Sequence, residues 1–507
     1  MKKIFAVLLS VIFVLTAIFA GCSKNTPEKP ALDGENGDGA KPGETDTPEK
    51  TPERFTPNLP DMDFDGYEFR AIVPINNLYG TFTFSVEEEN GDLINDAIYK
   101  RNKYIEDRYN VVFSQVEIVD NIFGMAGMFK TSVMSGSDDF DLGAIVDYFS
   151  LVTQGYALTV DKLPYLDITQ PWYAQHLNEL YTIGNKRLVA YSDECASMYD
   201  AVVAYCFNKE LIKNLGLENP YELVKNNQWT YDKFFGMCRA AAADLDGDGK
   251  MTDSDRYGIL SQFDELLAPF WVCAGVRTVV KDKDDMLVLN FEGNERLFDI
   301  LDKIHQNIYK GAKIFFDTHP ESGDKLTTYD AGNIAASGFI DVSRQQFENN
   351  LGLFITARMG RIPNLRAMEA DFGIIPYPQA YENSGKYYAM TNGGWLKVVP
   401  NHAPNPERTS IIMEALAAES RNVVVPALKE TSLKTKFARD DESAEMVDII
   451  FDNVFEDLGA TVFWATVRNA LINEVRGKGN FASVAEKQSK SLAKMLNGVN
   501  ESVMNLD

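Results

Sequence analysis

The sequence predicts an α/β protein with two lobes, each built on a mostly parallel β-sheet flanked by helices. The first observation behind this prediction is length, because about 450 residues follow a polar N-terminal stretch and one hydrophobic core rarely serves so many. The second is order along the chain. Strand-like apolar runs alternate with segments of helical periodicity, and this series begins twice, near residues 67 and 202. Such alternation is typical of parallel sheets with crossover helices.

The first series defines the first lobe, which we place at residues 61–195. Its strands are rich in β-branched and aromatic residues, whereas its helices carry apolar residues at helical spacing, and Asp92 is positioned to cap the first helix. We expect strands over 67–73, 111–118 and 142–146, and helices over 93–105 and 125–134.

The second series defines the second lobe, at residues 196–392. We expect the chain then to return to the first lobe over 393–455 and to the second over 456–507. A Ser483-x-x-Glu486 capping box predicts the start of the last helix. The expected strands are 202–207, 352–356, 372–375 and 396–399, and the expected helices are 209–215, one capped by Thr230, 462–475 and 483–496.

The N-terminus resembles the leader of a bacterial lipoprotein. Lys2 and Lys3 precede an apolar run over 4–19 that ends in Ala20-Gly21-Cys22. This ending resembles the lipobox, which implies that residues 1–21 are removed and that the Cys22 thiol carries a lipid. An ordinary secretory leader with an incidental cysteine is the alternative. Residues 22–60 contain almost no apolar side chains, so we expect a disordered linker. The resemblance to bacterial lipoproteins implies that this linker is lipid-anchored on the extracellular face of the cell membrane of a Gram-positive bacterium.

The charge of the chain bears on its partners, and the spacing of its cysteines bears on zinc binding and disulfides. The net charge of −25 disfavours nucleic acid as a partner. The remaining cysteines form no CxxC pair and have no zinc-type spacing with histidine. They permit disulfides outside a cell, but their apolar surroundings favour buried free thiols at Cys195, Cys206, Cys238 and Cys273.

Four stretches, in this order, resemble the extracellular solute-binding proteins of family 1, of the maltose- and oligosaccharide-binding type. They are Lys186 to Tyr191 followed by Tyr205 to Leu211, Asn219-Pro220 followed by Gln228 to Phe234, Asp371 to Pro378, and Phe463 to Asn473. The resemblance implies a periplasmic-binding-protein-like fold of type II, with a hinge near Ala190. It also implies a monomer without catalytic residues that captures a carbohydrate by lobe closure and delivers it to the permease subunits of an ABC importer.

Residues 244–255 have the spacing of a calcium-binding loop. Carboxylates stand at loop positions 1, 3 and 5, a glycine stands at position 6, and the loop closes with Asp at position 12, where bidentate Glu is usual. We therefore expect a structural calcium site of modest affinity, and a metal-free acidic turn is the alternative. The predicted ligands are Asp244, Asp246, Asp248, Lys250 through its carbonyl, Thr252 and Asp255.

Candidate ligand-binding residues lie at the ends of predicted strands, where open α/β sheets bind ligands. A sugar needs flat apolar faces for its ring and polar groups for its hydroxyls. The resemblance adds Trp464, because the matching tryptophan of the maltose-type segment stacks on sugar. It also implies ligand-contacting groups at the positions of Asp147, Tyr148, Asp193, Glu194 and Arg358. The full set is Tyr79, Asp147, Tyr148, Asp193, Glu194, Trp271, Arg358, Trp395 and Trp464, and each has a structural alternative as a core, loop or ion-pair residue.

Two other functions stay open at this point. A peptide-binding receptor of the same fold would pair the peptide termini with charged side chains. An extracellular glycosidase needs two carboxylates roughly 5–10 Å apart, which an acidic chain can supply by chance. The sequence has no eightfold βα succession, no Gly-x-Ser-x-Gly and no His-Glu-x-x-His, and we therefore expect a binding protein.

Overall fold

The computed structural model describes residues 54–75, 83–119, 124–195, 197–310, 313–318, 339–382, 384–430 and 440–506. The expected leader, Cys22 and most of the linker lie outside these residues, as does Tyr79. Residues 54–60, which we expected in the disordered linker, are instead held on the first lobe. Arg54 pairs with Glu419 at 2.6 Å, and the Phe55 ring meets the Trp172 ring edge-on at 6.4 Å. These contacts attach residues 54–60 to the folded part, so the expected linker ends before residue 54 and not at residue 60.

The first lobe is built on a four-stranded sheet in the order β14-β3-β1-β2. The strands β1 (Tyr67–Ile75), β2 (Val111–Val119) and β3 (Leu142–Ala144) are parallel, at the positions that the sequence predicts. The fourth strand, β14 (Lys397–Val398), pairs antiparallel with β3. It comes from the returning segment, as expected.

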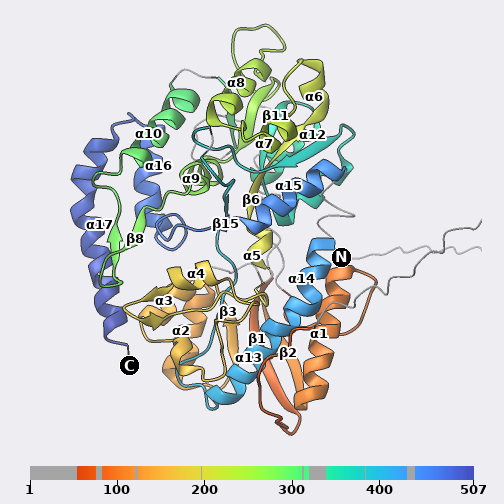
Figure 1. The fold of residues 1–507 in the computed structure, drawn as a ribbon, viewed down its shortest axis with the longest axis vertical. Helices are drawn as coiled ribbons and strands as arrows, with labels where there is room; N and C mark the ends of the chain where they lie inside the picture. Colours follow the sequence, from red (N-terminus) through yellow and green to blue (C-terminus); the bar gives the residue numbers. More distant parts are fainter. Residues whose placement is uncertain are drawn as a thin grey trace, which may run out of the picture. The chain divides into compact units, whose positions relative to one another are not determined.

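Helices from the two segments of the chain that form this lobe pack together. In Figure 1, α1 (Leu93–Tyr109), α13 (Pro406–Glu419) and α14 (Val425–Glu430) lie side by side. Asp92 caps α1 as predicted, because its side chain accepts hydrogen bonds from the Ile94 and Asn95 amides. The other elements of this lobe are α2 (Met125–Ser135), α3 (Tyr148–Thr153), η1 (Val160–Lys162), α4 (Gln175–Leu180), β4 (Thr182–Ile183), β5 (Lys186–Arg187) and the π-helix η4 (Ser420–Val424).

The second lobe is built on a five-stranded sheet in the order β10-β7-β11-β6-β12. The strands β10 (Phe315–Asp317), β7 (Tyr257–Ser261) and β11 (Gly352–Arg358) are parallel, whereas β6 (Val203–Asn208) runs antiparallel to β11 and to β12 (Phe372–Ile375). The sheet is therefore mostly parallel, as predicted, with β6 as the exception.

The helices that cover this sheet include α8 (Tyr231–Ala241), which Thr230 caps as predicted by accepting a hydrogen bond from the Lys233 amide. The elements that join or cover the second lobe are α5 (Ser197–Asp200), α6 (Lys209–Asn214), α7 (Pro220–Lys225), α9 (Phe263–Cys273), β8 (Val279–Lys281), β9 (Leu287–Leu289), α10 (Glu295–Ile304), the π-helix η2 (His305–Tyr309), α12 (Phe339–Glu348), η3 (Met359–Ala367), β13 (Ala389–Met390), α15 (Asp441–Asp452), β15 (Val454–Phe455), the π-helix η6 (Trp464–Arg468), α16 (Asn469–Arg476) and α17 (Phe481–Met504).

Two elements depart from the expected boundaries. Helix α15 packs on β12 of the second lobe, although we expected residues 393–455 to return to the first. Helix α17 begins earlier than the predicted capping box, because the Asn480 side chain accepts the hydrogen bond from the Ser483 amide. An asparagine N-cap serves as well as serine, so the capping box was the wrong signal for this helix start.

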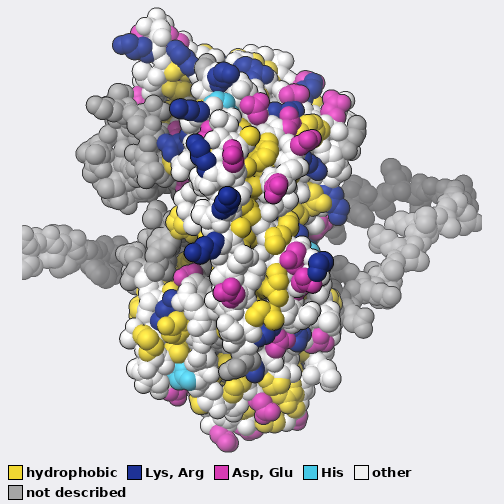
Figure 2. Space-filling model, turned by 90° about the vertical axis from the view of Figure 1, so that its left-hand side faces the viewer, with side chains coloured by type: hydrophobic (Ala, Val, Ile, Leu, Met, Phe, Trp, Pro, Cys, Tyr) yellow, Lys and Arg dark blue, Asp and Glu magenta, His cyan; other side chains and the backbone are white. Residues whose placement is uncertain are grey.

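The described cysteines after Cys22 are free and buried, which confirms the expectation of free thiols. Among the described helices, none has both the length and the apolar character to span a bilayer. Figure 2 shows the face that carries α17, where Lys and Arg side chains are interspersed with Asp and Glu.

Candidate functional site

The edge of the second sheet that collects the carboxyl ends of β7, β10 and β11 carries polar groups. Asp317 ends β10 and accepts a hydrogen bond from the Phe263 amide at 3.3 Å. Arg358 ends β11 and forms a 2.9 Å ion pair with Glu265 of α9, with both side chains about 15% exposed. In open α/β sheets this edge binds ligands, so the predicted residue Arg358 lies where a ligand would sit, already paired.

The corresponding edge of the first sheet carries Asp147 and Tyr148, which follow β3. Asp147 is exposed, whereas Tyr148 is buried in the first turn of α3. The segments that follow β1 and β2, and with them Tyr79, lie outside the described residues. The predicted aspartate is therefore accessible at this edge, and the predicted tyrosine is internal.

The segment over 454–476 contacts both lobes. Strand β15 pairs with β13 between the two sheets, where Figure 1 also places α5. On the first lobe, the Phe463 ring lies 5.7 Å from the Phe149 ring of α3. On the second lobe, the Arg476 guanidinium lies 3.7 Å from the Phe263 ring centre, at the carboxyl end of β7. This segment therefore connects the edges of the two sheets at which the carboxyl ends of the parallel strands lie.

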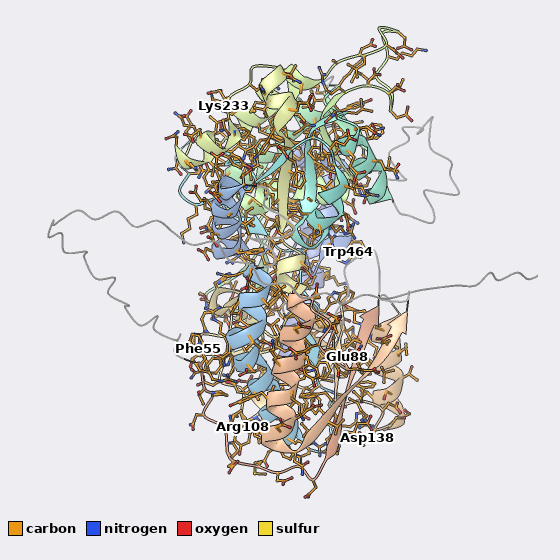
Figure 3. The ribbon with its side chains drawn as sticks, turned by 90° about the vertical axis from the view of Figure 1, so that its right-hand side faces the viewer. Phe55, Glu88, Arg108, Asp138, Lys233 and Trp464 are labelled. Atoms are coloured by element: carbon orange, nitrogen blue, oxygen red, sulfur yellow. The ribbon has the colours of Figure 1, made fainter. Side chains whose placement is uncertain are left out.

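Trp464 is the exposed aromatic residue of this segment, with 45% of its surface accessible. It opens the π-helix η6, and the Arg468 guanidinium lies 5.4 Å from its ring centre. Figure 3 places Trp464 at the junction of the two lobes, away from Lys233 on one lobe and from Arg108 and Asp138 on the other. Because π-helical turns are frequent at functional sites, and an exposed indole offers a flat apolar face, Trp464 can stack on a ring.

Tyr148 belongs to a buried hydrogen-bond network that reaches the same segment. Its hydroxyl lies 2.7 Å from the Tyr181 hydroxyl, which donates to Glu456 Oε1 at 2.7 Å. Thr461 donates to the same oxygen at 2.8 Å. Burial raises the pKa of Glu456 and the pKa of Tyr181. In this structure Tyr148 therefore helps to join the lobes and does not face solvent.

Asp193 and Glu194 follow the first crossing between the lobes, and both are buried ion-pair residues. Asp193 lies 3.3 Å from Arg421, and burial raises its pKa to about 6. Glu194 lies 2.5 Å from Lys397 of β14, whose ammonium also donates to the Glu194 carbonyl. Their charges are thus matched inside the protein.

Two predicted tryptophans are also internal. Trp271 is fully buried in α9 and donates its indole N–H to Asp457 Oδ2 at 3.3 Å. Trp395 is buried in the core of the first lobe with Phe69 and Leu142. Both take the structural role that we gave as the alternative.

The acidic loop brings part of the predicted calcium ligand set together. Carboxylate oxygens of Asp244, Asp246 and Asp255 lie within 4.8 Å of one another. Hard oxygen ligands at this spacing could hold a calcium ion. Asp248 stands outside this group, where it accepts a hydrogen bond from the Lys250 amide, and Thr252 donates its amide hydrogen to Asp255. These hydrogen bonds also fit a metal-free turn, so the calcium site stays a prediction.

Sequence reasoning missed several groups at the junction of the lobes. The carboxylates of Glu456 and Asp457 lie between the lobes, and Arg468 lies on Trp464. Asp200, the last residue of α5, lies against Gly360 just after β11. None of these residues stands in a local pattern, because their neighbours come from distant parts of the chain.

The comparison with solved structures supports the two-lobed fold. No protein-family model and no curated protein sequence matches the chain. Among solved structures, it is similar to the sugar-binding protein MalE from Xanthomonas citri, with a TM-score of 0.55 and 12% identity over 87% of this chain and 100% of that one.

Two further solved structures are similar over comparable lengths. The galacto-N-biose-/lacto-N-biose I-binding protein of the ABC transporter from Bifidobacterium longum gives a TM-score of 0.53 and 15% identity over 86% of this chain and 98% of that one. The cyclic alpha-maltosyl-1,6-maltose binding protein from Arthrobacter globiformis gives a TM-score of 0.52 and 14% identity over 86% of this chain and 98% of that one. The chain therefore has the two-lobed fold of these sugar-binding proteins.

Proposed function

We propose that the protein is the extracellular solute-binding component of an ABC importer and that it captures a carbohydrate, most simply an oligosaccharide. The observation that carries this proposal is the exposed Trp464, presented by a segment that contacts both lobes of a sugar-binding fold. An exposed indole between two sheet edges is suited to the C–H face of a sugar ring.

Lobe closure supplies the mechanism of this proposal. The ligand contacts both lobes only in the closed form, so binding shifts an open–closed equilibrium by its differential affinity for the two forms. Permease subunits on another chain would then accept the closed, loaded protein. No step of this mechanism requires bond chemistry, and the similar proteins are binding proteins.

The binding test is isothermal titration calorimetry of the purified chain with lacto-N-biose, cyclic alpha-maltosyl-1,6-maltose, acarbose and maltose. The first three are named as ligands of proteins whose solved structures are similar to this chain. We expect at least one saccharide to bind, and Trp464→Ala to weaken it about tenfold, since stacking contributes roughly 0.5–1.5 kcal/mol beyond buried area. Phe55→Ala, an exposed aromatic on the first lobe, is the matched control.

The same titrations separate the alternatives. Heat from a mixture of short peptides, with none from any saccharide, would favour a peptide receptor. New reducing ends after incubation with oligosaccharides would show a glycosidase. Either result overturns the carbohydrate-receptor proposal.

The proposal extends to the location of the protein. We propose that Cys22 carries a lipid and that residues 23–53 tether the folded part, as a monomer, to the outer face of the membrane. Expression of the full chain in a Gram-positive host, followed by detergent phase partitioning, tests this. Cys22→Ala should move the protein from the detergent phase to the medium, and partition of both forms into the aqueous phase would refute the anchor.

We also propose a structural calcium ion in the loop over 244–255, on the support of the clustered carboxylates of Asp244, Asp246 and Asp255. Calcium prefers such oxygen ligands. Because the loop precedes β7 of the second lobe, the ion would stabilise that lobe and not contact the sugar.

A further inference from the structure

Asp200 is a carboxylate at the junction of the lobes, and its backbone is fixed by both segments that lie beside it. It ends α5, which Figure 1 places between the two sheets. Just after it, the Asn392 amide donates to the Ala201 carbonyl at 3.1 Å, and the Met359 amide donates to the Val202 carbonyl at 2.8 Å. The side chain therefore projects from a defined position.

The carboxyl group packs directly on the backbone that follows β11. A Cβ atom added to Gly360 would lie 2.8 Å from Asp200 Cβ, 2.9 Å from its Cγ and 3.0 Å from its Oδ1. Gly360 stands two residues beyond Arg358, the end of β11. Asp200 thus reaches the carboxyl edge of the second sheet, where ligands bind in this class of fold, and glycine at 360 leaves it the space.

The charge of Asp200 is not matched within the described part of the chain. No described residue donates a hydrogen bond to its carboxylate or forms an ion pair with it, whereas Arg358 nearby is already paired with Glu265. Burial alone raises the pKa of Asp200 to about 6. A half-buried carboxylate without partners is costly to keep in a folded protein, and a bound ligand can supply what it lacks.

We propose that Asp200 is a ligand-binding residue whose carboxylate accepts hydrogen bonds from neighbouring hydroxyl groups of the bound sugar. This inference rests on the proposed function and deepens it. Two carboxylate oxygens can accept from two adjacent hydroxyls at once, and hydrogen bonds to a charged acceptor are the stronger ones. The ligand class that fits is a neutral saccharide with an unsubstituted vicinal diol.

The test is calorimetric titration of Asp200→Asn with the saccharide that binds the wild-type protein best among the panel above. The amide has nearly the same shape but loses one acceptor and the charge, so we expect the Kd to rise about tenfold to a hundredfold. Asp232→Asn, at an exposed carboxylate of α8, is the matched control and should bind like wild type.

Folding is checked in the same samples. Because Asp200→Asn removes a half-buried charge without partners among the described residues, its melting temperature without ligand should equal or exceed that of the wild type. Asp200→Glu, which keeps the charge but moves it by one methylene group, should also weaken binding, since its carboxylate no longer lies where that of Asp200 does.

The outcomes are distinguishable. Unchanged affinity in both Asp200 variants, with saccharide binding to the wild type intact, overturns the role of Asp200 and leaves the proposed function standing. A wild-type protein that binds no saccharide overturns both. Weakened binding in both variants, with normal folding and a normal Asp232→Asn control, supports the inference.

Discussion

Replacing Asp457 with alanine should destabilise the protein strongly, because one buried carboxylate satisfies several donors. It accepts hydrogen bonds from the Thr278 hydroxyl at 2.6 Å, from the amides of Thr278, Val279 and Gly459 at 2.9–3.2 Å, and from the Trp271 indole at 3.3 Å. Asp457 is fully buried, so these donors would lose their partner inside the protein.

The expected loss follows from the cost of unsatisfied donors. Each buried donor without a partner costs about 1–3 kcal/mol. Rotation of the Thr278 hydroxyl and relief of the buried charge offset part of the sum, because burial raises the pKa of Asp457 and thus disfavours its charged form. We therefore expect Asp457→Ala to lower the free energy of unfolding by about 3–5 kcal/mol.

Guanidinium unfolding followed by near-ultraviolet circular dichroism measures this loss. Asp457→Asn retains an oxygen for the backbone amides but replaces Oδ2, which accepts from the Trp271 indole and the Thr278 hydroxyl. The hydroxyl can rotate and accept from the new amide, so chiefly the Trp271 bond is lost and about 1–2 kcal/mol is expected. Asp448→Ala, at an exposed residue of α15, should change stability by less than about 0.5 kcal/mol. An Asp457→Ala protein within about 1 kcal/mol of the wild type would refute the reasoning from buried donors.

Three other predictions concern packing, pH and metal. Gly373→Ala should cost more than about 2 kcal/mol, because its Cβ would lie 2.1 Å from the Tyr221 hydroxyl oxygen, whereas Gly236→Ala in α8 meets nothing within 4 Å and should stabilise by up to about 1 kcal/mol; thermal unfolding compares them. Glu414 is buried, and burial raises its pKa from 4.5 to about 7, so its contribution to stability is full below pH 4.5 and is lost as the pH rises through 7. As the pH rises from 4.5 to 7, the free energy of unfolding of Glu414→Gln should therefore increase by about 3 kcal/mol relative to that of the wild type. Urea unfolding measures this, and a difference between the two proteins that does not change with pH would contradict it. Calcium at about 10 mM should stabilise the protein by roughly 1–3 kcal/mol if its Kd is on the order of 0.1–1 mM, Asp246→Asn should abolish the rise in melting temperature, and an equal rise with sodium chloride of matched ionic strength would argue against a site.

The fold could be predicted largely from local patterns, because strand alternation and helix caps are local properties. The strand over 372–375 and the Asp92 cap are where the sequence indicates. The start of α17 was missed because two good capping residues, Asn480 and Ser483, stand within one turn. The placement of α15 depends on packing against β12, which no local pattern encodes.

The candidate site was harder to predict, because exposure depends on the whole fold. Trp271, Trp395 and Trp464 are the same residue type near segment ends, yet two are buried and one is exposed. The resemblance singled out Trp464 where composition could not. Asp200 carries no sequence signal, since its significance comes from Gly360, which is distant in the chain and adjacent in space.

The course of α17 has a practical consequence for any engineering of this protein. The helix packs on β9 and α10 of one lobe, while the Lys186 ammonium of the other lobe holds the carbonyls of Met504 and Leu506 near the chain end. A rotation between the lobes must bend this helix or release its last turn. A purification tag or fluorescent protein fused after residue 507 would lie beside these Lys186 contacts and could disturb them. Reporters of lobe closure are therefore better inserted elsewhere.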